Sequence, residues 1–151
     1  MLHRLTRQWE SPPTWLLACI AALWLQARFV PVVAPLPATL HLGTLFILAG
    51  LTVIGLAAWQ FRSHATTILP RESPTAMIDT GLYAYSRNPI YVADALILAG
   101  VALRWDLAGL VLVPVFVWVI TQRFIAGEEA GLRARFGPAF DAYAARVKRW
   151  V

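Results

Sequence analysis

Two long apolar runs occupy the first part of the chain. Residues 14–33 are apolar except for Gln26 and Arg28, and residues 40–61 contain no charged side chain. A helix rises about 1.5 Å per residue, so about 20 apolar residues cross the ~30 Å hydrocarbon core of a bilayer. The pattern therefore predicts two membrane-spanning helices within residues 1–61, separated by the prolines that follow the first run.

Two shorter apolar runs follow, at residues 90–103 and 107–120. Only the connection Arg104-Trp105-Asp106 separates them, which is short enough for a tight turn between helices. We predict a helical hairpin over residues 90–126 whose arms are marginal in length for a full crossing. Together the runs predict an all-α integral membrane protein with about four transmembrane helices.

Residues 127–151 form a more polar C-terminal segment. Its apolar side chains recur at three- and four-residue spacing, which places them on one face of an amphipathic helix. A break in this helix is predicted at Gly137-Pro138. Most basic residues fall elsewhere, as expected for a helix on the cytoplasmic surface of a membrane. The apolar positions are Leu132, Phe136, Phe140, Tyr143 and Val147.

Two glycines of the second run predict close helix packing. Gly43 and Gly50 are two turns apart and so share a helix face, whereas Gly55 does not complete a regular repeat with them. Small residues let membrane helices approach closely, so we expect this face to contact another helix.

Composition and charge support the membrane assignment. The 151 residues have room for one domain, and 59% of them are hydrophobic and 14% charged, against roughly 45–50% and 25% in soluble proteins. Of the 13 lysines and arginines, 2 precede the first run, 3 lie in residues 62–88 and 6 follow from Arg123 onward. The positive-inside tendency then places both termini and the 62–89 loop in the cytoplasm. Basic residues beside apolar runs explain the net charge of +5 without a nucleic-acid partner. We also expect no metal, because Cys19 stands alone and the three histidines are scattered.

The most distinctive stretch is a polar and aromatic block, DTGLYAYSRNPIY, from Asp79 to Tyr91. It lies between the second and third apolar runs and contains three tyrosines and one arginine. Gly81 permits backbone conformations closed to other residues, and Pro89 can open a helix at its first turn. We interpret the block as a shaped loop that leads into the third helix and carries a ligand site at the membrane boundary.

The block and the C-terminal segment together resemble a known superfamily. The pattern Gly-x-Tyr-x-x-x-Arg-(His or Asn)-Pro-x-Tyr matches residues 81–91, and Glu-Glu-x-x-Leu-x-x-x-Phe-Gly matches residues 128–137. In this order and spacing they resemble the isoprenylcysteine carboxyl methyltransferase and phospholipid methyltransferase superfamily of membrane enzymes. The resemblance covers roughly the second half of the chain and does not extend to the first two spans.

The resemblance implies transfer of a methyl group from S-adenosylmethionine to a lipophilic acceptor. The cofactor pocket would lie between the loop of residues 62–89, which we call the central loop, the hairpin and the C-terminal segment. Arg87 and Glu129 are the residues on which we expect catalysis to depend. By position in the motifs, the residues that would line the pocket are Gly81, Leu82, Tyr83, Arg87, Asn88, Pro89, Tyr91, Glu128, Glu129, Arg149 and Trp150.

The same residue types suit S-adenosylmethionine on chemical grounds. Arg87 can pair bidentately with its carboxylate, and a glutamate can hold its ammonium group or ribose hydroxyls. Tyrosine rings attract the positively charged sulfonium, each contact being worth about 0.5–2 kcal/mol. Methyl transfer is an in-line displacement that needs alignment and exclusion of water more than a strong base. Asn88, which replaces a histidine of many family members, cannot take a proton near neutral pH.

Each of these residues also has a plainer explanation. Arg87 could be a positive-inside anchor, and the tyrosines could belong to an interfacial aromatic belt. Glu128 and Glu129 could be favoured by the dipole at a helix N-terminus.

Asp94 and Arg123 are the candidate acceptor-binding residues. Asp94 is the one acid within an apolar run, and an acid within a membrane is a functional hypothesis by default. It shares a helix face with Tyr91, so it either looks into the site and contacts the acceptor or lies at interfacial depth and is solvated. Arg123, at the end of the fourth run, either holds a carboxylate acceptor or anchors the helix.

Two other functions are compatible with the sequence. A small four-helix transporter would use Asp94 as its coupling acid, although the first span has no acid and such a protein does not need the long tail. A non-catalytic lipid-binding subunit could have kept the fold, although the intact motifs argue against decay. The oligomeric state stays open, and so does the acceptor, which could be an isoprenylcysteine carboxylate, a phospholipid amine or a small thiol that arrives through the membrane lipids.

Overall fold

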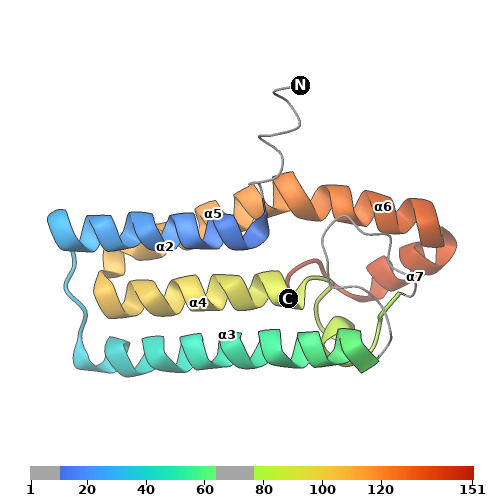
Figure 1. Ribbon diagram of the computed structural model, residues 1–151. Helices are drawn as coiled ribbons and strands as arrows, with labels where there is room; N and C mark the ends of the chain where they lie inside the picture. Colours follow the sequence, from blue (N-terminus) through green and yellow to red (C-terminus); the bar gives the residue numbers. More distant parts are fainter. Residues whose placement is uncertain (1–10, 64–76) are drawn as a thin grey trace.

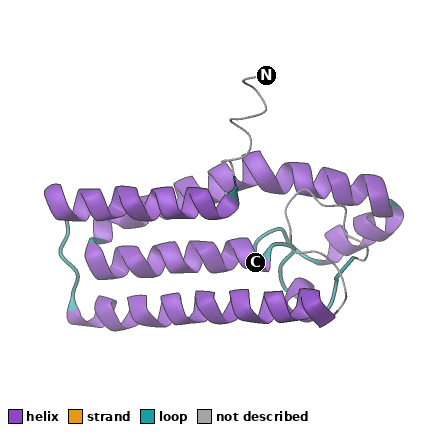
Figure 2. Cartoon of the chain, viewed as in Figure 1, coloured by secondary structure: helices purple, strands orange, loops and turns teal. Residues whose placement is uncertain are grey.

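The computed structural model describes residues 11–63 and 77–151, and helices dominate this part of the chain. Figure 2 shows helices and loops and, among the described residues, no strand, which confirms the all-α prediction. Two of the three scattered histidines, His3 and His64, lie outside the described residues. The elements are α2 (Pro12–Phe29), α3 (Pro37–Ser63), η2 (Gly81–Ala84), α4 (Pro89–Trp105), η3 (Leu107–Val111), α5 (Leu112–Ile120), η4 (Thr121–Ile125), α6 (Ala126–Phe136) and α7 (Pro138–Arg146).

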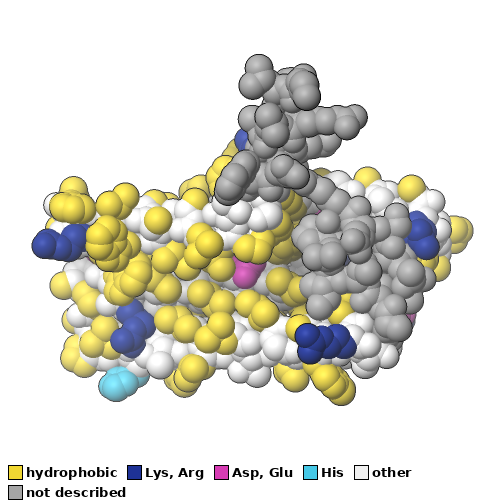
Figure 3. Space-filling model, viewed as in Figure 1, with side chains coloured by type: hydrophobic (Ala, Val, Ile, Leu, Met, Phe, Trp, Pro, Cys, Tyr) yellow, Lys and Arg dark blue, Asp and Glu magenta, His cyan; other side chains and the backbone are white. Residues whose placement is uncertain are grey.

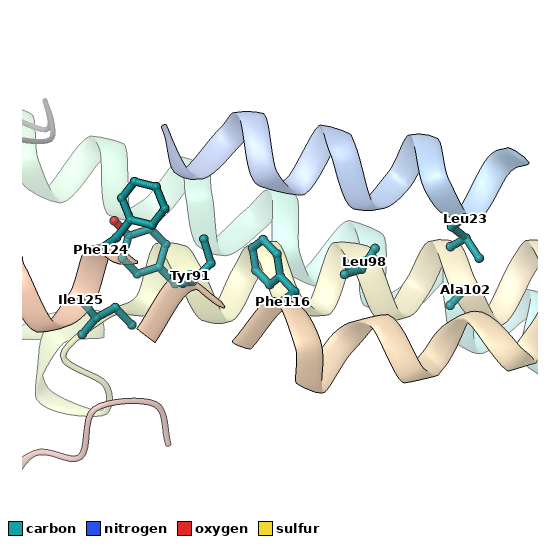
Figure 4. Close-up of a cluster of buried hydrophobic side chains, with 8 residues drawn as sticks. Leu23, Tyr91, Leu98, Ala102, Phe116, Phe124 and Ile125 are labelled. Carbon is teal, nitrogen blue, oxygen red and sulfur yellow. The ribbon is translucent and has the colours of Figure 1, made fainter. Parts of the chain in front are cut away.

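Helix α4 is the centre of the molecule. It lies between α2 and α3 in Figure 1 and also packs against η3 and α5. Its inner face presents Tyr91, Leu98 and Ala102 to the main hydrophobic core, which Leu23 of α2 and Phe116 of α5 complete. Figure 4 shows these side chains in a row between the helices. Because α4 begins at Pro89, as the sequence predicts, the core directly fixes the residues that follow the central loop.

Helices α3 and α4 approach each other through glycines, as the second apolar run predicts. A Cβ on Gly43 would come 2.6 Å from the carbonyl oxygen of Gly100, and a Cβ on Gly50 would come 2.7 Å from that of Ala93. Gly55 has no such neighbour within 4 Å. The shared face of Gly43 and Gly50 is therefore a packing face, as small residues between membrane helices usually are.

Two helices are long and apolar enough to cross a membrane: α3, and a continuous helix from Leu107 to Phe136. Many large hydrophobic side chains on α2 and α3 are exposed, and Figure 3 shows them spread over one face of the bundle. So large an apolar surface favours lipid over water as its surroundings. Full crossings by α2 and α4, with 18 and 17 residues, and the cytoplasmic position of the termini stay predictions. The exposed residues include Leu17, Trp24, Leu25, Phe29, Leu45, Leu48, Leu51 and Trp59.

The fourth apolar run continues further than its hydrophobic pattern suggests. The sequence places the end of the hairpin at residue 126, whereas the structure continues the same helix to Phe136. Gly127 and Gly131 lie within it, and single glycines inside a helix weaken it without ending it. The helix ends where it is predicted to break, because Gly137 has a positive φ of 52° and Pro138 opens α7.

The apolar face of the C-terminal segment packs within the protein. Phe140, Tyr143 and Val147 form a second buried cluster, which Leu132 and Met77 cover. Met77 lies at the start of the described central loop, so this cluster fastens α6 and α7 to that loop. Contact of these helices with a membrane surface stays a prediction.

Asp106 closes the opposite end of the bundle. Its carboxylate is 1% exposed and accepts hydrogen bonds from the amides of Val32 and Val33, at 2.6 and 3.0 Å, and from Gln26 Nε2 at 3.0 Å. It also accepts from the amide of Ala108 at 2.9 Å. These hydrogen bonds, led by that from Val32, outweigh burial and lower the pKa of Asp106 from 3.8 to about 2. One carboxylate thus ties the α2–α3 connection to the turn after α4.

We expect Asp106→Asn to lower the melting temperature by several degrees at neutral pH, because an asparagine amide group would face backbone donors. The folded pKa lies below the ordinary value, so the carboxylate stabilises the fold fully above about pH 4 and loses this effect towards about pH 2. Thermal unfolding in detergent should be measured at neutral pH and at about pH 2. Between these pH values the melting temperature of the wild type should fall further than that of the variant. Parallel losses would contradict the prediction, and Asp141→Asn, at an exposed position, is the control.

Candidate active site

A side chain of α3 holds the start of the central loop. Gly81 has a positive φ of 58°, and a Cβ there would come 2.6 Å from Gln60 Nε2. Gln60 Nε2 donates to the Thr80 carbonyl oxygen at 2.6 Å, and Gln60 Oε1 accepts from the Leu82 amide at 3.3 Å. The predicted need for glycine at position 81 is confirmed, and its reasons are the backbone conformation and the space that Gln60 fills.

The end of the same loop is covered by residues 147–151, which we call the C-terminal strap. The Arg87 amide donates to the Lys148 carbonyl oxygen at 3.0 Å, and Asn88 Nδ2 donates to the Arg149 carbonyl oxygen at 2.9 Å. Figure 1 shows the C-terminus beside the first turn of α4. Asn88 is thus a donor to the strap, a function that needs no proton transfer.

Glu129 on α6 joins the loop to the strap by charge. Its side chain is buried, and its Oε1 lies 3.2 Å from Arg87 Nη1. Arg149 Nε and Nη2 donate to its two oxygens at 3.0 and 2.6 Å, which is the bidentate geometry of strong arginine–carboxylate pairs. These hydrogen bonds and the charge of Glu129 raise the pKa of Arg149, so its guanidinium group stays charged.

Tyr91 and Glu128 make a second contact between α4 and α6. The Tyr91 hydroxyl donates to Glu128 Oε1 at 2.9 Å, and the Tyr91 ring is part of the main core. The two adjacent glutamates therefore face different partners: Glu128 a phenol and Glu129 two cations. The pair of acids is placed against the Arg-Asn-Pro-x-Tyr motif, which is far from it in the sequence.

Two tyrosines line the central loop. They take no part in the ion pairs of Arg87, Glu129 and Arg149, which we call the charged cluster. Tyr143 donates its hydroxyl to the Tyr83 carbonyl oxygen at 2.8 Å, and the Tyr83 ring meets Phe61 edge to face at 5.6 Å. Burial is the main reason that the pKa of Tyr143 rises to about 12 and that of Tyr83 rises further. Both phenols are therefore neutral hydrogen-bonding groups at physiological pH.

The strap is anchored to a π-helical turn, η4. Trp150 Nε1 donates to Thr121 Oγ1 at 3.2 Å, and the Trp150 ring packs on the main core. A π-turn adds one residue to a helical turn and is frequent at functional sites. Here it lies directly before the helix that carries Glu128 and Glu129.

The two candidate acceptor-binding residues lie apart from each other. Asp94 is buried on α4, one turn after Tyr91. Arg123 lies in η4, where its guanidinium is 5.3 Å from the centre of the Trp15 ring. Asp94 therefore shares the face of α4 that carries Tyr91, whereas Arg123 contacts a side chain of α2.

A hollow of about 440 Å³ opens beside the central loop. Of the predicted cofactor residues in the described chain, Gly81 and Leu82 line it, together with Thr80 and side chains of α3 such as Trp59 and Gln60. The charged cluster lies elsewhere, against the strap. Leu82 thus lines the hollow and also donates its amide hydrogen bond to Gln60. Pro89 is the buried first residue of α4 and does not line the hollow.

Three polar side chains that organise the site escaped the sequence analysis. Gln60 holds the loop, Thr121 holds Trp150, and the buried Ser86 accepts from the Asn88 amide at 3.1 Å. Gln60 and Thr121 offered a signal, since each is a polar residue at the end of an apolar run. Ser86 offered only its place inside the motif.

The residues fit a small zwitterion with a positive charge, such as S-adenosylmethionine. Arg87 Nε is buried and has no hydrogen-bond partner within the described part of the chain, so a donor is available for a carboxylate. Glu128 accepts only from Tyr91 among the recorded hydrogen bonds, which leaves acceptor capacity for an ammonium or hydroxyl group.

Comparison with models of protein families gives a match. A family model described as Phospholipid methyltransferase matches residues 38–139, which is more than half of the 151 residues. The match begins in α3, includes the central loop and both motifs, and stops before Arg149 and Trp150. The comparisons with curated proteins and with solved structures gave no match.

Proposed function

The chain belongs to the phospholipid methyltransferase family, and from this membership we propose that it transfers a methyl group from S-adenosylmethionine to a lipophilic acceptor. The observation that carries the proposal is the cluster in which the buried Glu129 joins Arg87 and Arg149. The cluster lies where the two family motifs meet. The family also confirms the resemblance found in the sequence and, with the two apolar helices, points to a membrane protein.

In this proposal the cluster binds the polar end of the cofactor. The free Nε–H of Arg87 donates to the carboxylate, and Glu128 accepts from the ammonium or from ribose hydroxyls. Tyr91 lies next to Glu128 and offers a ring to the sulfonium. When bound, S-adenosylmethionine supplies an electrophilic methyl group whose bonding electrons return to sulfur as the acceptor's lone pair forms the new bond.

The remaining residues position these groups and exclude water. Asn88 and Arg87 donate hydrogen bonds to main-chain carbonyl oxygens of the strap. The Trp150 ring packs the end of the strap against the main core. Alignment and exclusion of water are the main requirements of an in-line displacement. No residue of the cluster needs to act as a general base towards the cofactor. The transporter and the non-catalytic subunit gain no support from the family match.

Calorimetry with S-adenosylmethionine on the detergent-purified protein tests this function. We expect micromolar binding, about −8 kcal/mol, by the wild type. Arg87→Gln should weaken it about 30-fold, because it removes a charge-assisted hydrogen bond worth about 2 kcal/mol. Arg133→Gln is the control, since Arg133 is exposed on α6 and pairs with Asp141 away from the cluster. A folded wild type without binding would refute the proposal.

A further inference from the structure

The hollow beside the central loop has a mostly apolar lining. It holds about 440 Å³, within the range of about 300–1,000 Å³ that is usual for ligand pockets. One wall is formed by the last two turns of α3, including Leu56 and Trp59, and the other by Gly81 and Leu82 of η2. Leu56 and Trp59 are 47% and 69% exposed, so this wall offers uncovered apolar surface to a ligand.

The two polar side chains that α3 contributes to the lining are used within the protein. Gln60 bonds the main chain of Thr80 and Leu82, and the Ser63 hydroxyl donates to the Gln60 carbonyl oxygen at 2.8 Å. No charged side chain is among the described residues that line the hollow. A polar ligand would therefore lose its hydration and find few partners, whereas a hydrocarbon chain needs none.

The hollow continues an apolar surface of α3, the helix that is long and apolar enough to cross a membrane. Four exposed side chains share one face of this helix by their spacing: Leu45, Leu48, Leu56 and Trp59. Thr52 lies between them and donates its hydroxyl to the Leu48 carbonyl oxygen at 2.8 Å, so it interrupts this face little. A lipid chain that lies along this face therefore reaches the hollow without leaving apolar surface.

We propose that the hollow binds one hydrocarbon chain of a bilayer lipid and that this chain orders the central loop. The chain packs against Leu82, whose carbonyl oxygen accepts from the amides of Tyr85 and Ser86, both at 3.2 Å. These hydrogen bonds form the turn that leads to Arg87. The head group stays outside the hollow, so the site selects the chain and not the head group. This inference does not depend on methyl transfer.

Native mass spectrometry of the detergent-purified protein with added lipid tests the inference. Dipalmitoyl phosphatidylcholine and dipalmitoyl phosphatidylglycerol share their chains and differ in head group, and we expect their affinities to agree within threefold. The dihexanoyl form of either lipid should bind at least tenfold more weakly. Hydrogen exchange of the Tyr85 and Ser86 amides should slow at least threefold when the dipalmitoyl lipid is bound.

Leu56→Trp tests the position, because a larger side chain there occupies the hollow. It should weaken binding of the dipalmitoyl lipids at least fivefold and abolish the slower exchange. Leu48→Trp is the matched control, since it makes the same change on the same face of α3, two turns before the hollow. It should bind as the wild type does, and thermal unfolding shows whether both variants are folded.

Equal lipid affinity in the two folded variants would overturn the site. A preference of more than tenfold for one head group would overturn its assignment to the chain, and bound lipid without slower exchange would overturn its effect on the loop. Calorimetry with S-adenosylmethionine tests the proposed function separately, so either proposal can fail while the other stands.

Discussion

Replacing Glu129 with glutamine is expected to reduce S-adenosylmethionine affinity at least a hundredfold and to detach the C-terminal strap. Glu129 is buried and is the only carboxylate recorded in contact with both Arg87 and Arg149 in the described chain. Removing one partner of a buried ion pair typically costs about 3–5 kcal/mol. The Arg149 side chain is 40% exposed and regains some solvation, so we expect a loss of about 3 kcal/mol in the free energy of S-adenosylmethionine binding.

Two measurements separate these effects. Calorimetry reports the affinity, and hydrogen exchange of residues 147–151 reports whether the strap stays in place. Glu128→Gln is the matched control, since it changes the adjacent acid, whose recorded partner is the Tyr91 hydroxyl. An amide oxygen still accepts that hydrogen bond, so we expect a less than tenfold loss of affinity. Equal effects of the two substitutions would contradict the special place of Glu129.

A double-mutant cycle can assign the strap contact to this ion pair. Arg149→Met alone should release the strap, and adding it to Glu129→Gln should cost little more. A coupling energy near zero would mean that the two side chains act independently.

The helical fold follows from the sequence to within a few residues where apolar runs are bounded by clear signals. The second run, residues 40–61, becomes α3 at Pro37–Ser63, and the third, residues 90–103, becomes α4 at Pro89–Trp105. The continuation of the fourth run to Phe136 was not predictable from apolar residues alone. Beyond Ile125 the helix is more polar, and Glu129 is its buried residue. The helix is held there by contacts with the rest of the protein, which a hydrophobic pattern does not reveal.

The composition of the site follows from the motifs, but its pairing does not. The motifs indicate that an arginine and a glutamate belong to the site. They do not indicate that Glu129 forms ion pairs with Arg87 and Arg149. Side-chain partners depend on how α4, α6 and the strap meet, and these lie far apart in the sequence. For the same reason Gln60 looked like the end of a span, although it holds the central loop.

The position of α4 depends in turn on its glycine contact with α3, and Gly100→Val is expected to disrupt it. A Cβ at residue 100 would come 2.6 Å from the Gly43 carbonyl oxygen and 3.0 Å from the Ile47 amide nitrogen. Backbone atoms cannot turn aside as a flexible side chain can, so the helices must separate. Overpacking typically costs about 1–3 kcal/mol, and we expect the upper end here.

Gly55→Val is the matched control on α3, because nothing lies within 4 Å of a Cβ at that position. The same change of residue type should therefore leave the unfolding temperature in detergent nearly unchanged at Gly55 and lower it clearly at Gly100. Since Asn88 is the N-cap of α4 and Tyr91 lies in its first turn, separation from α3 should also weaken S-adenosylmethionine binding. Equal unfolding temperatures for the two variants would show that α3 and α4 do not depend on this close approach, and the site would then have to be held by the strap and α6 alone.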